Sequence, residues 1–362
     1  MQIIADRRAL HQIPEIQWEL PKTAQYLKNS LQNLSCEVLT PVGDAVCAWF
    51  DFGAEKTLAF RSDMDALPVA EQTGLSFAST HPGMMHACGH DGHMAMLLEL
   101  ARQIDKLTSL DRNILLIFQP AEESPGGAKI LCDTGILETY RVETIFGMHL
   151  WPELEPGKVH SCKGPMMACA SEVTVEITGK SSHIGRADRG IDAMAAAVAF
   201  YNGAAELERS VPEGVYRLLK FGKFSSGTAR NAIAAHARLE GTLRVFDDAL
   251  FDQLRKGLYD LAEAVEKSTG AKVSVHLREG YPVVNNPEDL YDKVAAITPI
   301  LPIGKPSMVA EDFSWYQRHV PGILFFLGVG NTPSLHATNF DFDESVLQEG
   351  ADFFLHLAKN FR

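Results

Sequence analysis

Short apolar runs alternate with helix-like segments through the first half of the chain. Ile114–Phe118 is a continuous apolar run, which is typical of a strand covered on both faces. Thr57–Phe60 and Thr144–Met148 have the same character, whereas Met94–Ile104 contains neither glycine nor proline and is predicted to be a helix. Strands that alternate with helices predict an α/β domain with a mostly parallel sheet.

The middle of the chain follows a different pattern. Glu172–Thr178 alternates apolar and polar residues, as a strand does when only one of its faces is buried. Helix, strand, strand, helix and strand patterns then follow in order, at Ile191–Glu208, Tyr216–Phe224, His236–Phe246, Asp248–Ser268 and Lys272–Leu277. The resulting order β-α-β-β-α-β is that of a ferredoxin-like domain.

The last segment returns to α/β character. Ile323–Leu327 is another buried strand pattern, and a helical pattern runs from Glu344 to the end of the chain. We therefore predict a discontinuous α/β catalytic domain made of residues 1–168 and 282–362. A smaller ferredoxin-like α+β domain is predicted as an insertion at residues 169–281.

Composition restricts the class of partner. A hydrophobic fraction of 46% predicts a buried core, and a formal net charge of −13 without a basic stripe disfavours nucleic acid and anionic membranes. No apolar stretch is long enough for a transmembrane helix, and the first residues do not resemble a signal peptide. The six cysteines are widely spaced with no CxxC pair, which indicates free thiols. We expect a cytoplasmic protein.

Metal-ligating residue types lie just beyond the ends of four predicted strands. They are Asp63 with Asp65, Glu122 with Glu123, His149, and His336. In an open α/β sheet, ligands bind at the carboxyl ends of the strands. Four such placements together favour a binding site at this edge over chance.

The segment His86–His93 holds three imidazoles, a thiol and a carboxylate within eight residues, just before the predicted helix. These are the donors that zinc and similar divalent ions prefer. The alternative is a surface loop with incidental histidines or helix-capping residues, and the other four clusters make it the weaker interpretation. Glu122 and Glu123 could likewise stabilise a helix N-terminus. Adjacent carboxylates also suit a division in which one binds metal and the other transfers protons, which we favour.

Seven segments, in this order along the chain, resemble the M20 metallopeptidase family. They are Arg7–Glu15, Arg61–Pro68, Met85–His93, Phe118–Glu123, Gly147–His149, Ala310–Phe313 and Leu335–His336. Within the family, the Cys-Gly-His-Asp element and the Glu-Glu pair resemble the amidohydrolase branch. That branch includes hippurate hydrolase, auxin-conjugate hydrolases, aminoacylases and N-acetyldiaminopimelate deacetylase. The resemblance covers nearly the whole chain.

The resemblance implies two divalent metal ions (zinc, manganese, cobalt or nickel) in the catalytic domain and a lid domain that mediates homodimerisation. By position, the metal ligands would be Cys88, which bridges the two ions, with His90, Glu123, His149 and His336. Glu122 would act as general base and acid, and Asp63 would orient a ligand. In the lid, His183 would stabilise the oxyanion in the partner's site, and Asn231 and Arg244 would bind the substrate carboxylate. Taken alone, each of these three lid residues is more often structural.

The chain departs from the family pattern at three places. Arg61 stands where peptidases of the wider clan have a histidine ligand, and the Cys-Gly-His element compensates for this loss in the amidohydrolase branch. Ala234 replaces a proline that usually follows Asn231, and Ser181-Ser182 replaces a glycine-rich pair before His183. These lid changes bear on the placement of Asn231 and on substrate preference.

The predicted function is a metal-dependent amidohydrolase that cleaves small N-acyl amino acids to a carboxylate and a free amino acid. The alternative within this class is an N-acetyl-L,L-diaminopimelate deacetylase of lysine biosynthesis. A cysteine hydrolase built on Cys88 would leave Glu122-Glu123, His149 and His336 without a role. A non-catalytic metal or amino-acid sensor would leave Glu122 without one.

Overall fold

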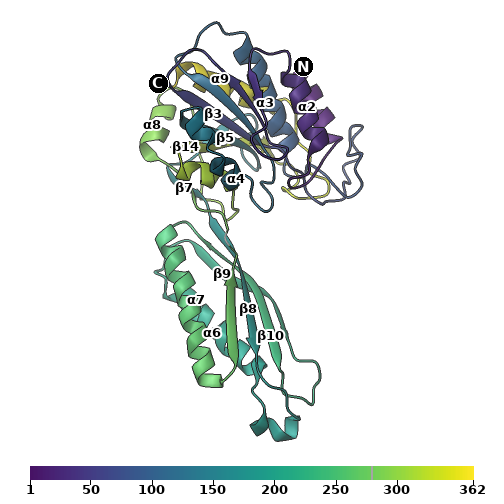
Figure 1. The fold of residues 1–362 in the computed structure, drawn as a ribbon, viewed down its shortest axis with the longest axis vertical. Coiled ribbons are helices and arrows are strands. Elements are labelled where there is room, and N and C mark those ends of the chain that lie inside the picture. Colours follow the sequence, from purple (N-terminus) through teal and green to yellow (C-terminus); the bar gives the residue numbers. More distant parts are fainter. Residues whose placement is uncertain (279) are drawn as a thin grey trace. The chain divides into compact units, whose positions relative to one another are not determined.

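The computed structural model describes residues 1–278 and 280–362, and the chain separates into two compact units (Figure 1). The larger unit comprises Met1–Met166, Val284–Lys305 and Glu311–Arg362. The second unit comprises Met167–Val283 and the short segment Pro306–Ala310. That short segment lies outside the range predicted for the inserted domain.

The larger unit contains an eight-stranded sheet in the order β1-β2-β4-β3-β5-β14-β6-β13. Its four central strands, all mutually parallel, are β4 (Asn113–Gln119), β3 (Thr57–Asp63), β5 (Val142–Pro152) and β14 (Gly322–Gly330). The outer strands are β1 (Glu37–Leu39), β2 (Val46–Phe50), β6 (Val159–Ser161) and β13 (Leu301–Pro302). The predicted α/β domain with a mostly parallel sheet is confirmed. Because the central strands are parallel, their carboxyl ends lie at one edge.

Helices cover both faces of this sheet. The principal helices are α1 (Gln2–His11), α2 (Pro21–Leu31), α3 (His90–Asp105), α4 (Ala128–Asp133), α5 (Ile136–Thr139), α8 (Glu288–Ala295), the 3₁₀ helix η2 (Asp312–Arg318) and α9 (Val346–Asn360). Successive side chains of β5 point to opposite faces. Met148 packs against Gly350 of α9, whereas Gly147 lies against Phe313 of η2. Every residue of β3 and β4 is buried, as predicted for strands covered on both sides.

The second unit has the predicted β-α-β-β-α-β order. Its elements are β8 (Cys169–Thr178), α6 (Ala193–Ser210), β9 (Arg217–Ser226), β10 (His236–Val245), α7 (Asp248–Thr269) and β11 (Lys272–Leu277). The strands form an antiparallel sheet in the order β11-β8-β10-β9, and α6 and α7 pack on one of its faces (Figure 1). In β8, Val173, Val175 and Ile177 are buried against these helices. The ferredoxin-like prediction is confirmed.

Local signals set the ends of the helices. The structure begins α6 at Ala193, two residues later than predicted, because the Asp192 carboxylate accepts hydrogen bonds from the backbone N–H groups of Met194 and Ala195. In the other direction, α3 begins at His90, four residues earlier than predicted. Among the described residues, no helix combines the length and apolar character needed to cross a membrane.

Candidate metal centre

The carboxyl edge of the parallel sheet gathers the predicted ligand residues. Asp63 is the last residue of β3, Glu122 and Glu123 follow β4, His149 lies near the end of β5, and His336 follows β14. Three groups of residues each bring one potential ligand atom per residue to within 4.8 Å of the others in the same group. The groups are Cys88, Glu123 and His336; His90, Glu122 and Glu123; and Asp63, His90, His93 and His149. The structure therefore places all five predicted metal ligands, Glu122 and Asp63 at one edge.

Residues with left-handed backbone angles lie next to several of these side chains or carry them. Gly89, between Cys88 and His90, has a φ of 84°, and an added Cβ there would lie 3.0 Å from Leu150 Cδ1. Glycine adopts this conformation without steric cost. Ala121, just before Glu122, has a φ of 58°, and His336 itself has a φ of 67°. Non-glycine residues rarely adopt such angles, and those that do cluster at active sites.

His90 and His149 each direct one ring nitrogen toward the other ligand residues. His90 Nδ1 lies 2.7 Å from the carbonyl oxygen of Asp65, and His149 Nδ1 lies 2.7 Å from that of Leu150. Because a carbonyl only accepts, each ring carries a proton on Nδ1 and turns Nε2 toward the ligand residues, where a deprotonated Nε2 can bind a metal ion. His90 Nε2 is buried without a hydrogen-bond partner, and His149 Nε2 lies 3.4 Å from Cys88 Sγ. This is the arrangement of metal-binding histidines, whose other nitrogen donates to a carbonyl or carboxylate.

His93, in the same segment, differs from His90. Its Nδ1 lies 2.6 Å from Asp63 Oδ1, and its Nε2 accepts a hydrogen bond from the backbone N–H of Leu150 at 2.8 Å. Both ring nitrogens are therefore occupied, and His93 has none left for a metal ion. His86 is buried but belongs to none of the ligand groups found among the described residues. Of the three imidazoles in this segment, only that of His90 is oriented as a ligand.

The carboxylate of Asp63 is held between three cationic or hydrogen-bonding groups. His93 donates to Oδ1, Arg61 Nη1 donates to Oδ2 at 3.0 Å, and His90 Nε2 lies 3.6 Å from Oδ2. Burial by itself would raise the pKa of Asp63, but His90, His93 and Arg61 together hold this pKa well below its usual range. Asp63 is therefore an ionised carboxylate that orients its neighbours.

The loop that carries Glu122 and Glu123 is held at both ends by carboxylates. Asp65 Oδ1 accepts from the backbone N–H of Glu122 at 2.9 Å, and Asp65 Oδ2 accepts from that of Glu123 at 3.1 Å. Asp312 Oδ2 accepts from the N–H groups of Gly127 and Ala128, each at 2.9 Å. These four bonds fix the backbone on which the two glutamates are mounted.

The Glu122 carboxyl group lies in an acidic environment. One of its oxygens is within 4.8 Å of oxygens of Glu311 and Asp312, and the side chain is buried. Burial, followed by the negative charges of Glu311 and Glu123, raises the pKa of Glu122 well above its usual range. A carboxyl group with a raised pKa in such a site is suited to accept and return a proton near neutral pH.

Arg61 is the counter-cation of this acidic cluster. Its guanidinium is buried and pairs with Asp63, with Asp312 (Nη2 to Oδ1, 2.7 Å) and with Glu311 (Nη2 to Oε1, 3.1 Å). Its Nε donates to Gln119 Oε1 at 2.8 Å. A guanidinium has no lone pair to offer a metal ion, so Arg61 cannot replace the histidine ligand of the wider clan. It neutralises carboxylates instead.

The environment of Cys88 disfavours a cysteine hydrolase. Burial, together with the charges of Glu123, Glu122 and Asp63, raises the pKa of the Cys88 thiol well above its usual range. Nucleophilic cysteines need the opposite, a pKa lowered by cations or a helix N-terminus. The thiol, imidazole and carboxylate donors, and the unpartnered His90 Nε2, fit a divalent transition metal instead.

The three predicted lid residues all lie in the second unit, at two separate places. His183 and Asn231 are neighbours, since the backbone N–H of Ile184 donates to the carbonyl of Asn231 at 3.0 Å. Arg244 lies near the far end of β10, where its Nη1 donates to the carbonyl oxygen of Met308 at 2.5 Å. At least eight residues of β10, roughly 26 Å, separate Arg244 from the loop that carries Asn231.

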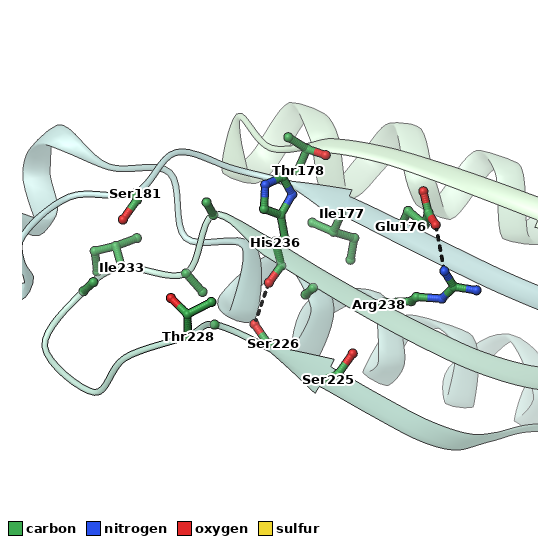
Figure 2. A pocket seen from close by; sticks show the side chains of 15 residues that line it. Glu176, Ile177, Thr178, Ser181, Ser225, Ser226, Thr228, Ile233, His236 and Arg238 are labelled. Carbon is green, nitrogen blue, oxygen red and sulfur yellow. Dashed lines mark hydrogen bonds and ion pairs between the residues drawn. The ribbon is translucent and has the colours of Figure 1, made fainter.

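A hollow of about 570 Å³ lies in the second unit, beside the loop that follows Asn231. Figure 2 shows hydroxyl groups of Ser181, Ser225 and Thr228 around it, with an ion pair between Arg238 and Glu176 at 3.2 Å. None of the metal-ligand groups found among the described residues is formed by its lining. We therefore place the candidate catalytic chemistry at the sheet edge of the larger unit.

Sequence reasoning missed the residues that support the ligands. The sequence identifies Asp65 only as a possible ligand type, yet it fixes the backbone of Glu122 and Glu123. Glu311 and Asp312 stand out in the sequence only as part of the segment Ala310–Phe313, which resembles the family. Their signal in the sequence was the adjacent acidic pair just before a buried aromatic residue, Phe313.

Comparison with known proteins gives a consistent result. The model of the peptidase family M20/M25/M40 matches residues 59–360. N-acetyldiaminopimelate deacetylase of Streptococcus uberis is 35% identical over 361 residues, which cover 96% of this chain and 96% of that protein. The protein of the same name from Lactobacillus helveticus is 34% identical over 366 residues, which cover 97% and 95%.

Two solved structures match over nearly the full chain. A putative aminohydrolase from methicillin-resistant Staphylococcus aureus has a TM-score of 0.93 at 29% identity, covering 98% of this chain and 95% of that one. The YXEP protein of Bacillus subtilis, described as a dinuclear metal binding peptidase of the M20 family, has a TM-score of 0.86 at 30% identity. That match covers 99% of this chain and 96% of that one.

Replacing Arg61 tests its role as counter-cation. We expect Arg61→Gln to lower the free energy of unfolding of the larger unit by about 3–5 kcal/mol, because it leaves three buried carboxylates uncompensated. All four tryptophans (Trp18, Trp49, Trp151 and Trp315) lie in this unit, so urea denaturation followed by tryptophan fluorescence reports on it alone.

The matched control is Lys163→Gln, which removes an exposed ion pair with Asp292 in the same unit. Such surface pairs contribute about 0–1 kcal/mol. Equal, small losses in the two variants would contradict the counter-cation role of Arg61.

Proposed function

The chain belongs to the peptidase family M20/M25/M40 and is a metal-dependent amidohydrolase, and from this we propose that it removes the acetyl group of N-acetyldiaminopimelate. Full-length relatives of this name, about one-third identical, favour this substrate over N-acyl amino acids in general. The reaction breaks the acetyl C–N bond with water and yields acetate and diaminopimelate. The observation that carries the hydrolytic chemistry is the convergence of the ligand set and Glu122 at one sheet edge, and the name of the full-length relatives carries the substrate.

We propose that the metal ions are held by five residues of the larger unit, namely Cys88, His90, Glu123, His149 and His336. The unpartnered Nε2 of His90 and the Nδ1–carbonyl contacts of His90 and His149 support this set. Bound divalent ions supply a Lewis acid for the acyl carbonyl and lower the pKa of water. Zinc, manganese, cobalt and nickel all accept imidazole, thiolate and carboxylate donors.

The protein's own groups then carry the proton. Glu122 accepts a proton from the attacking water and returns it to the nitrogen of the departing amino acid, as its raised pKa allows. Asp65 fixes the backbone of Glu122, so the carboxyl group meets the water in a defined position. Asp63 holds His93 and approaches His90, which restricts the orientation of the ligand ring.

The geometry of the second unit supports action across a dimer. His183 and Asn231 lie at one end of β10 and Arg244 at the other, roughly 26 Å apart along the strand. A substrate of the size of N-acetyldiaminopimelate cannot contact both ends of one such unit. We propose that Arg244 binds the substrate carboxylate in its own subunit. His183 and Asn231 then act in the site of the partner, where His183 donates to the oxyanion.

An exposed apolar face of the second unit is suited to that dimer. Met194, Val198 and Tyr201 are each nearly half exposed (46, 45 and 46%), and their spacing places them on one face of α6. Phe224, 45% exposed, lies on β9, which is one of the two edge strands of the sheet. An apolar helix face beside an unpaired strand edge is a typical homodimer surface.

Removal of the metal and of the proton carrier tests the chemistry. We expect EDTA to abolish the release of acetate from N-acetyl-L,L-diaminopimelate, and added Mn²⁺, Zn²⁺, Co²⁺ or Ni²⁺ to restore it. Glu122→Gln should lower kcat by about 10²–10⁴-fold while the protein still binds metal, because only general acid–base catalysis is lost. Turnover that survives complete metal removal would refute the proposal.

The substrate is tested by a matched pair of compounds. Nα-acetyl-L-lysine has the structure of N-acetyl-L,L-diaminopimelate without the carboxylate that is farther from the acetylated nitrogen. We expect kcat/KM for the lysine compound to be lower by about 100-fold or more, because a site built to bind a carboxylate rejects an analogue that lacks it. Similar values for both compounds and for hippurate would instead support a general N-acyl amino acid hydrolase.

Mixing two inactive variants tests the composite site. His183→Ala and Glu122→Gln are each expected to be inactive. When equal amounts of the two variants are refolded together, half of the dimers contain one chain of each variant. One of the two sites in such a mixed dimer is intact, so about a quarter of the wild-type activity should return. When Val198→Glu is added to both chains, we expect light scattering to show monomers and the mixture to recover no activity. The control Tyr259→Glu, at an exposed position of α7, should change neither the dimer nor the recovered activity. No recovery in dimers that do exchange subunits would place His183 in its own subunit's site.

A further inference from the structure

The segment Arg7–Glu15 carries part of the family resemblance, yet none of its side chains belongs to the proposed metal centre. It comprises the end of α1 and the turn that follows. Three of its polar side chains, those of Arg7, His11 and Glu15, are nevertheless buried. Buried polar groups are costly unless they are paired, so their partners indicate what the segment does.

Arg7 and His11 converge on one oxygen of Asp91. Arg7 Nε donates to Asp91 Oδ2 at 2.9 Å, and His11 Nδ1 lies 2.7 Å from the same atom. Arg7 also pairs with Asp341 and Glu344 at 2.9 and 3.1 Å. Asp91 follows His90 in the first turn of α3. The two side chains therefore anchor the turn that carries a proposed metal ligand.

His11 has two different carboxylate neighbours, one for each ring nitrogen. Its Nδ1 faces Asp91, whereas its Nε2 lies 3.2 Å from Glu71 Oε1. Of these two carboxylates, only that of Asp91 belongs to a residue next to His90 in the chain. The two contacts can therefore be removed separately.

The other end of the segment holds the opposite side of His90. The backbone carbonyl of Glu15 accepts a hydrogen bond from the N–H of Ala66 at 2.7 Å. Ala66 follows Asp65, whose carbonyl accepts from His90 Nδ1 and whose carboxylate holds the N–H groups of Glu122 and Glu123. The Glu15 side chain is itself fixed by the N–H groups of Lys22 and Thr23.

We propose that Arg7 and His11 are positioning residues of the metal centre, and that they set the orientation of His90 by clamping Asp91 while Glu15 holds the neighbouring strand end. The inference rests on the metal centre proposed above. Partners that orient a ligand in this way typically change metal affinity by about 10–100-fold when they are removed.

Two substitutions at one position separate this role from simple packing. In His11→Asn the amide nitrogen lies near the place of Nδ1 and can still donate to Asp91. In His11→Gln it lies near the place of Nε2 and reaches Glu71 instead. Both variants remove a buried ring, so a merely structural role predicts the same effect for the two. Arg7→Gln and Arg8→Gln form a second pair, because Arg8 is exposed and its ion pair is with Glu344 rather than with Asp91.

The measurement is the affinity of the full-length protein for Co²⁺, by competition with a chelator, together with the visible absorption of the cobalt-loaded protein. We expect His11→Gln and Arg7→Gln to weaken Co²⁺ binding by about 10–100-fold and to shift the absorption bands. His11→Asn and Arg8→Gln should stay close to wild type in both readouts.

Equal affinities and spectra in all four variants, with only the melting temperature lowered, would overturn the inference, as would equal losses in the two His11 variants. If Arg7→Gln does not fold, the His11 pair decides alone. Wild-type protein that binds no cobalt would show that the metal centre itself is wrong. Wild-type protein that binds cobalt, together with variants whose cobalt affinity is unchanged, would refute only the positioning role of Arg7 and His11.

Discussion

The concentration of carboxylates at one edge of the sheet is the constraint on which the rest of this site depends. Six of them meet there: Asp63, Asp65, Glu122, Glu123, Glu311 and Asp312. Like charges removed from water repel strongly unless each finds a cation or hydrogen-bond donors. Arg61 compensates three of them, and four backbone N–H groups between Glu122 and Ala128 compensate two. The same bonds that make the charges tolerable fix the geometry of the loop.

Unequal compensation gives the carboxylates different roles. Asp63 is surrounded by His90, His93 and Arg61, which hold its pKa far below the usual range, so it orients its neighbours as a permanent anion. Glu122 is buried with Glu311 and Glu123 nearby, which raises its pKa, so it can hold a proton. Two residues of similar chemistry thus diverge because of what lies next to them.

Sequence patterns located the sheet edge because they depend on local periodicity and on strand direction. The apolar runs of β3, β4, β5 and β14 are continuous, and the carboxyl ends of parallel strands must meet. The support of the site was not visible in this way. Arg61 and Asp312 are 251 positions apart in the chain, and no local pattern joins them. His90 and His93 are indistinguishable by type and spacing. Their Nε2 atoms differ in availability to a metal ion because the N–H of Leu150 donates to the ring of His93.

The acidic edge also separates metal binding from the choice of substrate. Every nitrogen of Arg61 is engaged, its Nε with Gln119 and its two Nη atoms with Asp63, Glu311 and Asp312. A substrate that carries carboxylates cannot draw on this cation, because its guanidinium nitrogens are already taken. Recognition of such a substrate therefore needs positive charge from bound metal and from arginines outside the cluster, of which Arg244 in the second unit is the proposed one. Substitutions in the second unit can then alter the preferred acyl amino acid while the ligands, Glu122 and Arg61 stay as they are. This division explains why the metal chemistry could be predicted from the sequence whereas the acyl group could not.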